Sequence, residues 1–134
     1  MPRFALCLAV LALCGSLSSA VLAQDPGEWA HRAELLAPNS EFAVAELDGK
    51  LYILGGYPAN RETQTTVQVY DIATDTWEHG RDLPAPNNHG MAVGVNGKVY
   101  LIGGQTSADS GDSYVDTVYE LDPAVGEWVE KASM

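Results

Sequence analysis

The feature that most constrains the fold is a nine-residue stretch that occurs twice, 48 residues apart. Residues 48–56 read Asp-Gly-Lys-Leu-Tyr-Ile-Leu-Gly-Gly, and residues 96–104 read Asn-Gly-Lys-Val-Tyr-Leu-Ile-Gly-Gly. An Asp-Gly or Asn-Gly pair between apolar runs is the strongest short-range signal for a β-hairpin, because both turn residues must accept a positive φ. The apolar run predicts a strand buried on both faces, and the glycine pair ends it where a Cβ does not fit or φ is positive. The duplication predicts an all-β repeat protein.

Tryptophans mark a second landmark of the repeat. Trp29, Trp77 and Trp128 are spaced by 48 and 51 residues, and the three extra residues belong in the polar loop 105–116, where an insertion costs little. Each complete repeat then predicts four short strands. The first strand consists mainly of small and apolar residues (42–47 and 90–95), and the second is the duplicated stretch. The third strand ends at Asp71 or Asp122, and the fourth starts at the tryptophan.

These landmarks resemble the kelch family of propeller repeats. The residues that carry the resemblance are Gly55, Gly56, Tyr70 and Trp77 in the first copy, and Gly103, Gly104, Leu121 and Trp128 in the second. Leu121 departs from the usual tyrosine but keeps an apolar body. The resemblance implies that each repeat is a four-stranded antiparallel blade, its first strand nearest the propeller axis and its fourth strand outermost.

The predicted fold is all-β, with two kelch-type blades and an N-terminal outer strand around Trp29, in an incomplete ring. Blade 1 is expected at about 39–80 and blade 2 at about 87–131. Propellers close with about four to eight blades, so two leave the ring open. Three interpretations follow: a truncated part of a longer protein, which the blade count favours; a short chain that closes a ring by self-association; or an open two-blade module.

Residues 1–23 have the pattern of a signal peptide. Arg3 precedes an apolar run from Phe4 to Leu13, and small residues lead to a cleavage site after Ala23. The kelch-repeat region is then 24–134, and the predicted location is secreted or periplasmic. Both cysteines, Cys7 and Cys14, fall in the leader, so no disulfide framework is expected. A mature chain without cysteine also excludes the chemistry of the copper-radical oxidases of similar fold, which need a cysteine cross-linked to tyrosine.

Charge and residue spacing narrow the function further. The chain has a net charge of −11, which argues against nucleic acid and against anionic membrane surfaces. His31 and His79 occupy equivalent repeat positions and are expected on different blades, and no zinc-binding, nucleophile-elbow or phosphate-loop spacing occurs. We therefore expect no catalytic residues, no metal and no cofactor.

The resemblance implies that ligands contact loops around the axial mouth. The matching positions lie just before the first strand and just after the glycine pair: Ser40, Glu41, Tyr57, Asn88, His89 and Gln105. They could equally be ordinary polar residues at strand ends. No arginine stands at these positions, so an acidic ligand loses support. The predicted function is an exported binding module for a protein or glycan ligand. The alternative is part of an exported kelch-type sugar-modifying enzyme, such as a sialic acid mutarotase or epimerase.

Overall fold

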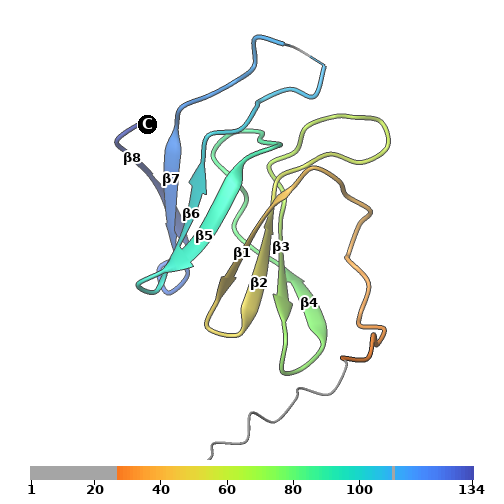
Figure 1. The fold of residues 1–134 in the computed structure, drawn as a ribbon. Helices are drawn as coiled ribbons and strands as arrows, with labels where there is room; N and C mark the ends of the chain where they lie inside the picture. The colour runs from red at the N-terminus through yellow and green to blue at the C-terminus, as the bar shows by residue number, and fades with distance from the viewer. Residues whose placement is uncertain (1–26, 110) are drawn as a thin grey trace, which may run out of the picture. The chain divides into compact units, whose positions relative to one another are not determined.

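The computed structural model describes residues 27–109 and 111–134, and residues 31–134 form one compact unit. The predicted signal peptide lies outside the described residues. The described residues form eight β-strands in two four-stranded antiparallel sheets (Figure 1). This confirms the all-β prediction of two four-stranded blades. None of the described segments is a helix of the length and apolarity needed to span a membrane.

Each sheet is a simple meander in which every strand pairs with the next one along the chain. Blade 1 consists of β1 (Ala43–Leu47), β2 (Lys50–Leu54), β3 (Val67–Asp71) and β4 (Thr76–His79). Blade 2 consists of β5 (Met91–Val95), β6 (Lys98–Ile102), β7 (Val118–Asp122) and β8 (Glu127–Lys131).

The duplicated turn dipeptides fix the register of the first hairpin in each blade. Asp48 and Gly49 have φ values of 52° and 76°, and Asn96 and Gly97 have 52° and 72°. Both turns therefore take positive φ at both central residues, as two-residue hairpins require. Leu47 pairs with Lys50 in blade 1, and Val95 pairs with Lys98 in blade 2.

The glycine pair allows a close approach of two chain segments at the end of β2. Gly55 has a φ of 63°, and a Cβ at this position would lie 2.1 Å from the carbonyl oxygen of Asn87. The next amide, of Gly56, donates a hydrogen bond to that carbonyl at 2.7 Å. A side chain at residue 55 would therefore break the contact between the end of β2 and the segment that leads into blade 2.

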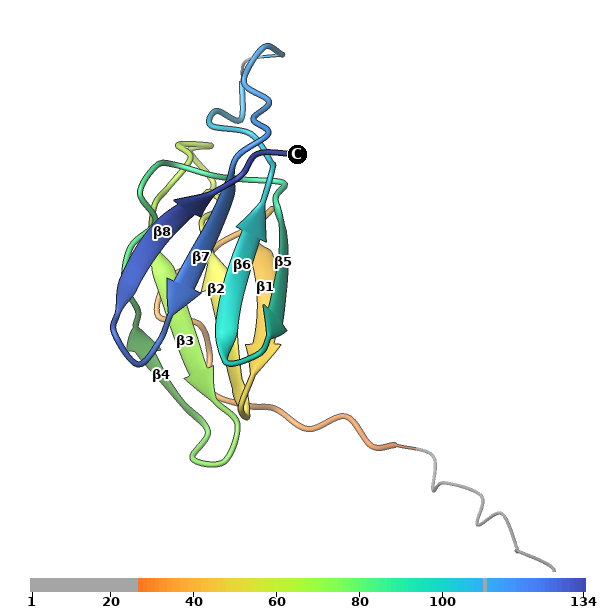
Figure 2. The same ribbon diagram turned by 90° about the vertical axis from the view of Figure 1, so that its left-hand side faces the viewer.

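The hydrophobic core lies between the two blades, which pack face against face (Figures 1 and 2). We call the face of a blade whose strand residues correspond to Ala43, Ala45 and Leu47 of β1 its forward face, and the opposite face its backward face. The forward face of blade 1 packs on the backward face of blade 2. Its buried residues are Ala43, Ala45, Leu47, Tyr52, Leu54, Val67 and Val69, and they meet Val99, Leu101 and Leu121 of blade 2.

The outer strand expected around Trp29 is not formed. Residues 27–39 contain no strand, and Trp29 is fully exposed. A strand needs a hydrogen-bonding neighbour, and no strand among the described residues precedes Ser40 to supply one. The other two tryptophans anchor the segments that lead into the blades: Nε1–H of Trp77 donates to the carbonyl of Ala33, and that of Trp128 to the carbonyl of Arg81, both at 2.9 Å.

Candidate ligand-binding rim

The six sequence-predicted residues lie at one end of the two blades, just beyond β1, β2, β5 and β6. Ser40 and Tyr57 exchange two backbone hydrogen bonds of 3.0 Å across the end of blade 1. Asn88 and Gln105 do the same at 2.8 Å across the end of blade 2. Four of the six residues therefore extend the strand ladders, which also fits the plainer interpretation of strand-end polar residues.

Glu41 and His89 join the two blades at this end. The backbone amide of His89 donates to the carbonyl of Glu41 at 2.9 Å, and Nε2 of His89 lies 3.2 Å from Oε2 of Glu41. Both residues have left-handed backbones, with φ values of 54° and 53°. Such strain in non-glycine residues is concentrated at functional sites, and here it recurs at the same position of both repeats.

The side chain of Asn88 holds the ring of His89 in its orientation. Its side chain is fully buried, and its Oδ1 lies 2.5 Å from Nδ1 of His89 while its Nδ2 donates to the hydroxyl of Thr63 at 2.8 Å. Because its amide nitrogen is already a donor, the Asn88 oxygen accepts the Nδ1 proton. Nε2 of His89 is then the ring nitrogen that faces Glu41. Asn88 is thus a supporting residue and not a surface contact.

Arg61 places a positive charge beside the six sequence-predicted residues, although it is not one of them. It lies in the β2–β3 loop, where its amide donates to the carbonyl of Pro58. Its guanidinium lies over the ring of Tyr57, 5.0 Å from the ring centroid. Its Nε donates to Asp109 at 2.9 Å, and its Nη2 donates to the carbonyl of Ala108 at 2.7 Å. The hydrogen bond from Arg61 to Asp109 is the main cause of the raised pKa of Arg61.

Arg61 lies outside the six sequence-predicted positions but brings an arginine next to one of them, Tyr57. The motif positions before the first strand and after the glycine pair indeed lack one, but the β2–β3 loop folds back over Tyr57. The sequence signal available was the Pro58 turn, which reverses the loop so that Arg61, at a φ of 62°, lies above the ring. We define the rim as Ser40, Glu41, Tyr57, Arg61, His89 and Gln105.

The rim residues differ in accessibility. Glu41, His89 and Arg61 have about half of their side chains exposed, at 49, 46 and 51%. Tyr57 is buried, and its ring stands 6.3 Å from that of His89 at a tilt of 48°. The rim therefore presents a carboxylate, an imidazole and a guanidinium above a buried aromatic ring. Among the described residues no cluster of three or more histidine, cysteine or acidic side chains could hold a metal ion.

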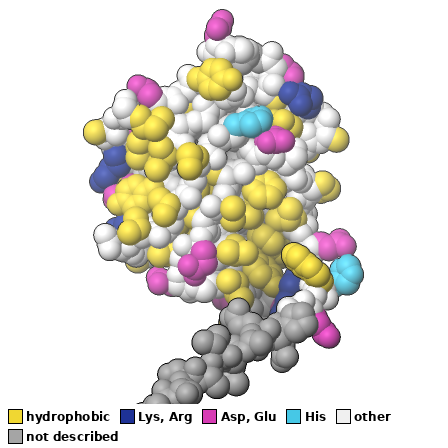
Figure 3. Space-filling view, viewed as in Figure 1, with side chains coloured by type: hydrophobic (Ala, Val, Ile, Leu, Met, Phe, Trp, Pro, Cys, Tyr) yellow, Lys and Arg dark blue, Asp and Glu magenta, His cyan; other side chains and the backbone are white. Residues whose placement is uncertain are grey.

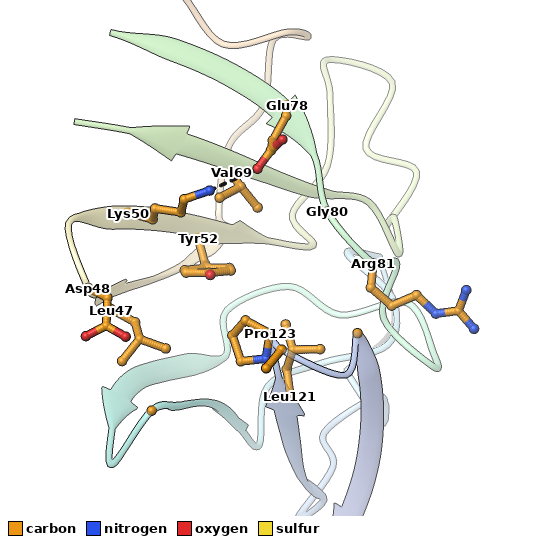
Figure 4. A pocket seen from close by; sticks show the side chains of 13 residues that line it. Leu47, Asp48, Lys50, Tyr52, Val69, Glu78, Gly80, Arg81, Leu121 and Pro123 are labelled. Atoms are coloured by element: carbon orange, nitrogen blue, oxygen red, sulfur yellow. Dashed lines mark hydrogen bonds and ion pairs between the residues drawn. The ribbon is translucent and has the colours of Figure 1, made fainter. Parts of the chain in front are cut away.

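A separate cleft of about 450 Å³ lies between the blades at the other strand ends (Figure 4). Leu47 and Tyr52 of blade 1 face Leu121 and Pro123 of blade 2 across it, and Lys50 and Glu78 form an ion pair of 3.2 Å at its edge. Burial is the main cause of the raised pKa of Tyr52. None of the sequence-predicted ligand residues lines this cleft.

Two meander sheets stacked face to face, each with the same turn, glycine pair and outer tryptophan, define the chain as a pair of β-propeller blades. Residues 38–84 and 91–134 match the Kelch motif. These ranges cover more than half of the chain, and the chain belongs to the kelch-repeat family.

The relatives found are much longer than the matched segment. Kelch-like protein 36 of Bos taurus is 51% identical over 45 residues, which are 33% of this chain and 7% of that protein. Kelch-like protein 24 of Rattus norvegicus and of Mus musculus is 36% identical over 64 residues, which are 46% of this chain and 11% of that protein. The matches thus span about a tenth or less of these relatives.

Proposed function

We propose that the chain is a non-catalytic kelch binding module whose rim contacts a protein or glycan ligand. The observation that supports this is the convergence of Glu41, His89 and Arg61 on one surface from two blades and a loop. Loops on a rigid β-scaffold are the usual place for binding residues. The exposed groups offer a hydrogen-bond acceptor, an imidazole and a guanidinium within one small area, which suits a polar ligand.

Arg61 forms an ion pair with Asp109, a residue of the β6–β7 loop. Both side chains are more than half exposed, so the pair is weak and a ligand group can compete for it. We therefore propose that a ligand carboxylate or hydroxyl replaces Asp109 on Arg61. Tyr57 stays in place beneath the guanidinium and keeps it oriented.

Site-directed photo-crosslinking tests the rim. A photoreactive amino acid replaces His89 in one variant and Val125, an exposed residue of the β7–β8 turn, in the control. The variants are exposed to extracellular protein and glycan fractions of the source. We expect a saturable adduct at position 89 that is lost in Arg61→Ala and Glu41→Ala backgrounds. Equal labelling at position 125, or an adduct unaffected by both substitutions, would contradict the proposal.

Export is the second part of the proposal and rests on the leader pattern of residues 1–23. The periplasmic or extracellular fraction should contain a chain whose N-terminal peptide starts at Gln24. Mass spectrometry of that peptide measures this directly. A chain that keeps Met1 or stays in the cytoplasm would contradict export and leave the rim proposal intact.

A further inference from the structure

The cleft between the two blades contains a phenol that has no hydrogen-bond partner. Tyr52 of β2 lines the cleft and is only 7% exposed, and no described side chain or backbone group hydrogen-bonds its hydroxyl. Among the described residues, the one fully enclosed side-chain oxygen or nitrogen without a hydrogen bond is Oδ1 of Asn87. The Tyr52 hydroxyl is therefore open to the cleft and not sealed in the core. An unpaired polar group that opens into a cleft is a place for a ligand atom.

The equivalent phenol of blade 2 has the partner that Tyr52 lacks. Tyr100 pairs across the sheet with Glu120, and its hydroxyl donates to the Glu120 carboxylate at 2.6 Å. Tyr52 pairs across the sheet with Val69, which offers no acceptor. A hydroxyl in an apolar environment is costly unless it forms a hydrogen bond. Blade 1 thus has the phenol without its acceptor, and an oxygen from outside the chain can take that place.

The walls around this hydroxyl are apolar and come from both blades. Leu47 and Val69 of blade 1 lie on one side of the cleft, and Leu121 and Pro123 of blade 2 lie on the other (Figure 4). Leu47, Val69 and Leu121 are 8, 5 and 3% exposed, so the core holds these walls in place. Ligand sites are mostly apolar hollows of about 300–1,000 Å³ with a few polar groups. At about 450 Å³, the cleft matches this description.

The charged groups near the cleft lie at its edge. On the face of the molecule shown in Figure 3, charged side chains lie mostly around the outline and hydrophobic ones gather over the strands. At the cleft, Lys50 is neutralised by Glu78, the Arg81 guanidinium points away, and Asp48 lies in the β1–β2 turn (Figure 4). A charged group buried beside Tyr52 would therefore lack a free counterion. Burial raises the pKa of Tyr52, so its hydroxyl keeps the proton that it can donate.

We propose that the cleft binds a small uncharged ring compound that carries a hydroxyl or carbonyl group. The ring packs between the Leu47 side of blade 1 and the Pro123 side of blade 2, and the Tyr52 hydroxyl donates a hydrogen bond to the ligand oxygen. Both blades that form the site belong to the compact unit of residues 31–134. No rim residue lines the cleft, so this is a second site that does not depend on the rim.

Benzene derivatives of nearly the same shape test this chemistry: p-cresol, toluene, p-toluate and 4-methylbenzylammonium. p-Cresol has the ring and the hydroxyl, toluene lacks the oxygen, and the other two compounds carry a negative or a positive charge. p-Cresol should bind about fivefold more tightly than toluene, which is the factor expected for an ordinary hydrogen bond. The charged compounds should bind no more tightly than toluene, because their charged groups would lose water without gaining a counterion.

NMR titrations of the isotope-labelled chain measure these affinities, which should be about millimolar for ligands of this size. The amide shifts of p-cresol binding should gather at Gly80, Gly97 and Gly126, which line the cleft. Tyr52→Phe keeps the ring and removes the hydroxyl, so it should weaken p-cresol about fivefold and leave toluene unchanged. Tyr100→Phe is the matched control in blade 2. It should leave both affinities unchanged, since Tyr100 does not line the cleft.

Blocking the mouth of the cleft gives a second test. Ala124 is exposed in the β7–β8 turn and lines the cleft, whereas the next residue, Val125, is 66% exposed and does not line it. Ala124→Trp should therefore abolish p-cresol binding and Val125→Trp should bind like wild type, with circular dichroism to confirm folding. In the wild-type chain, no saturable shift at the cleft, equal affinities for p-cresol and toluene, or tightest binding of a charged compound would overturn the proposal. Binding that persists in Ala124→Trp would also overturn it, since the ligand would then lie elsewhere.

Discussion

Blades 1 and 2 share one sequence pattern and one strand register but differ in what covers them. Leu54 and its counterpart Ile102 occupy the same place in their sheets, yet Leu54 is fully buried and Ile102 only partly so. The hydrogen bonds that build each blade recur, from the turn dipeptide to the tryptophan that anchors the preceding segment. The comparison separates two contributions to stability: the ladder, which each blade forms by itself, and the core, which needs a neighbouring blade.

The largest expected effect comes from truncating the core of blade 1. Leu54→Ala should lower the free energy of unfolding by about 3 kcal/mol, because it leaves a cavity between the blades. Ile102→Ala should cost only about 1 kcal/mol, because water already reaches part of that side chain. Chemical denaturation followed by tryptophan fluorescence gives both values. Equal losses at low protein concentration would mean that the two faces are covered alike.

Gly94, on the face of blade 2 that packs against blade 1, allows a second comparison of equivalent positions in the two blades. Gly94→Ala should cost about 2 kcal/mol, since the new Cβ meets the Glu46 carbonyl and forces the first strands apart. Glu46→Ala, at the equivalent position of blade 1, should cost less than about 1 kcal/mol, since its exposed side chain only accepts a hydrogen bond from the amide of Gly49. In urea titrations, Gly94→Ala should therefore unfold at a lower midpoint concentration than Glu46→Ala. A Gly94→Ala variant as stable as wild type would show that the first strands of the two blades can move apart without loss of stability.

Trp77 and Trp128 make equivalent hydrogen bonds in the two blades, so their substitution should lower the stability of the protein equally. Trp77→Phe and Trp128→Phe each remove one hydrogen bond of 2.9 Å to the segment before the blade. Each should cost about 1 kcal/mol, the net value of a typical hydrogen bond. Thermal melts of the two variants should overlap. A much larger loss for one of them would show that its leading segment is held in place mainly by that bond.

Much of the fold could be predicted from local sequence. Asp48-Gly49 and Asn96-Gly97 fix two hairpins by their backbone preferences. The landmarks of each repeat, ending at Trp77 or Trp128, correctly predicted four strands in each blade. The prediction around Trp29 was wrong because a strand also needs a partner, which a local pattern cannot supply.

At the rim, the motif positions led to Glu41 and His89, which do meet across the blades. Arg61 was missed because a loop brings it there, and the path of a loop depends on tertiary contacts. The loss of tyrosine at Leu121 also has a structural counterpart. Tyr70 in blade 1 donates to Asp75 at 2.5 Å, and blade 2 has Gly126 where Asp75 stands, so the donor and its acceptor are absent together.

The smallest expected effect is a pH dependence that belongs to blade 2. The hydrogen bond from Tyr100, followed by the contacts with Lys131 and the charge of Lys98, lowers the pKa of Glu120 below its ordinary 4.5. A carboxyl group whose pKa is lowered on folding stabilises the protein above its unfolded pKa, and this contribution is lost as the pH falls through the folded pKa. The contribution of Glu120 should therefore be present at neutral pH and be lost progressively as the pH falls from 4.5 through the lower pKa of the folded state.

Glu120→Gln should consequently have a slightly lower melting temperature than wild type at neutral pH, and the difference should vanish in acid. Glu130→Gln, an exposed site on the neighbouring strand β8, serves as the matched control and should follow wild type throughout. Melting temperatures by circular dichroism between neutral pH and about pH 2 provide the measurement. The counterpart in blade 1 is Val69, which has no titrating group, so this pH dependence is a property that one blade has and the other lacks. A Glu120→Gln curve parallel to wild type at every pH would show that Tyr100 and Lys131 hold the carboxylate without stabilising the blade.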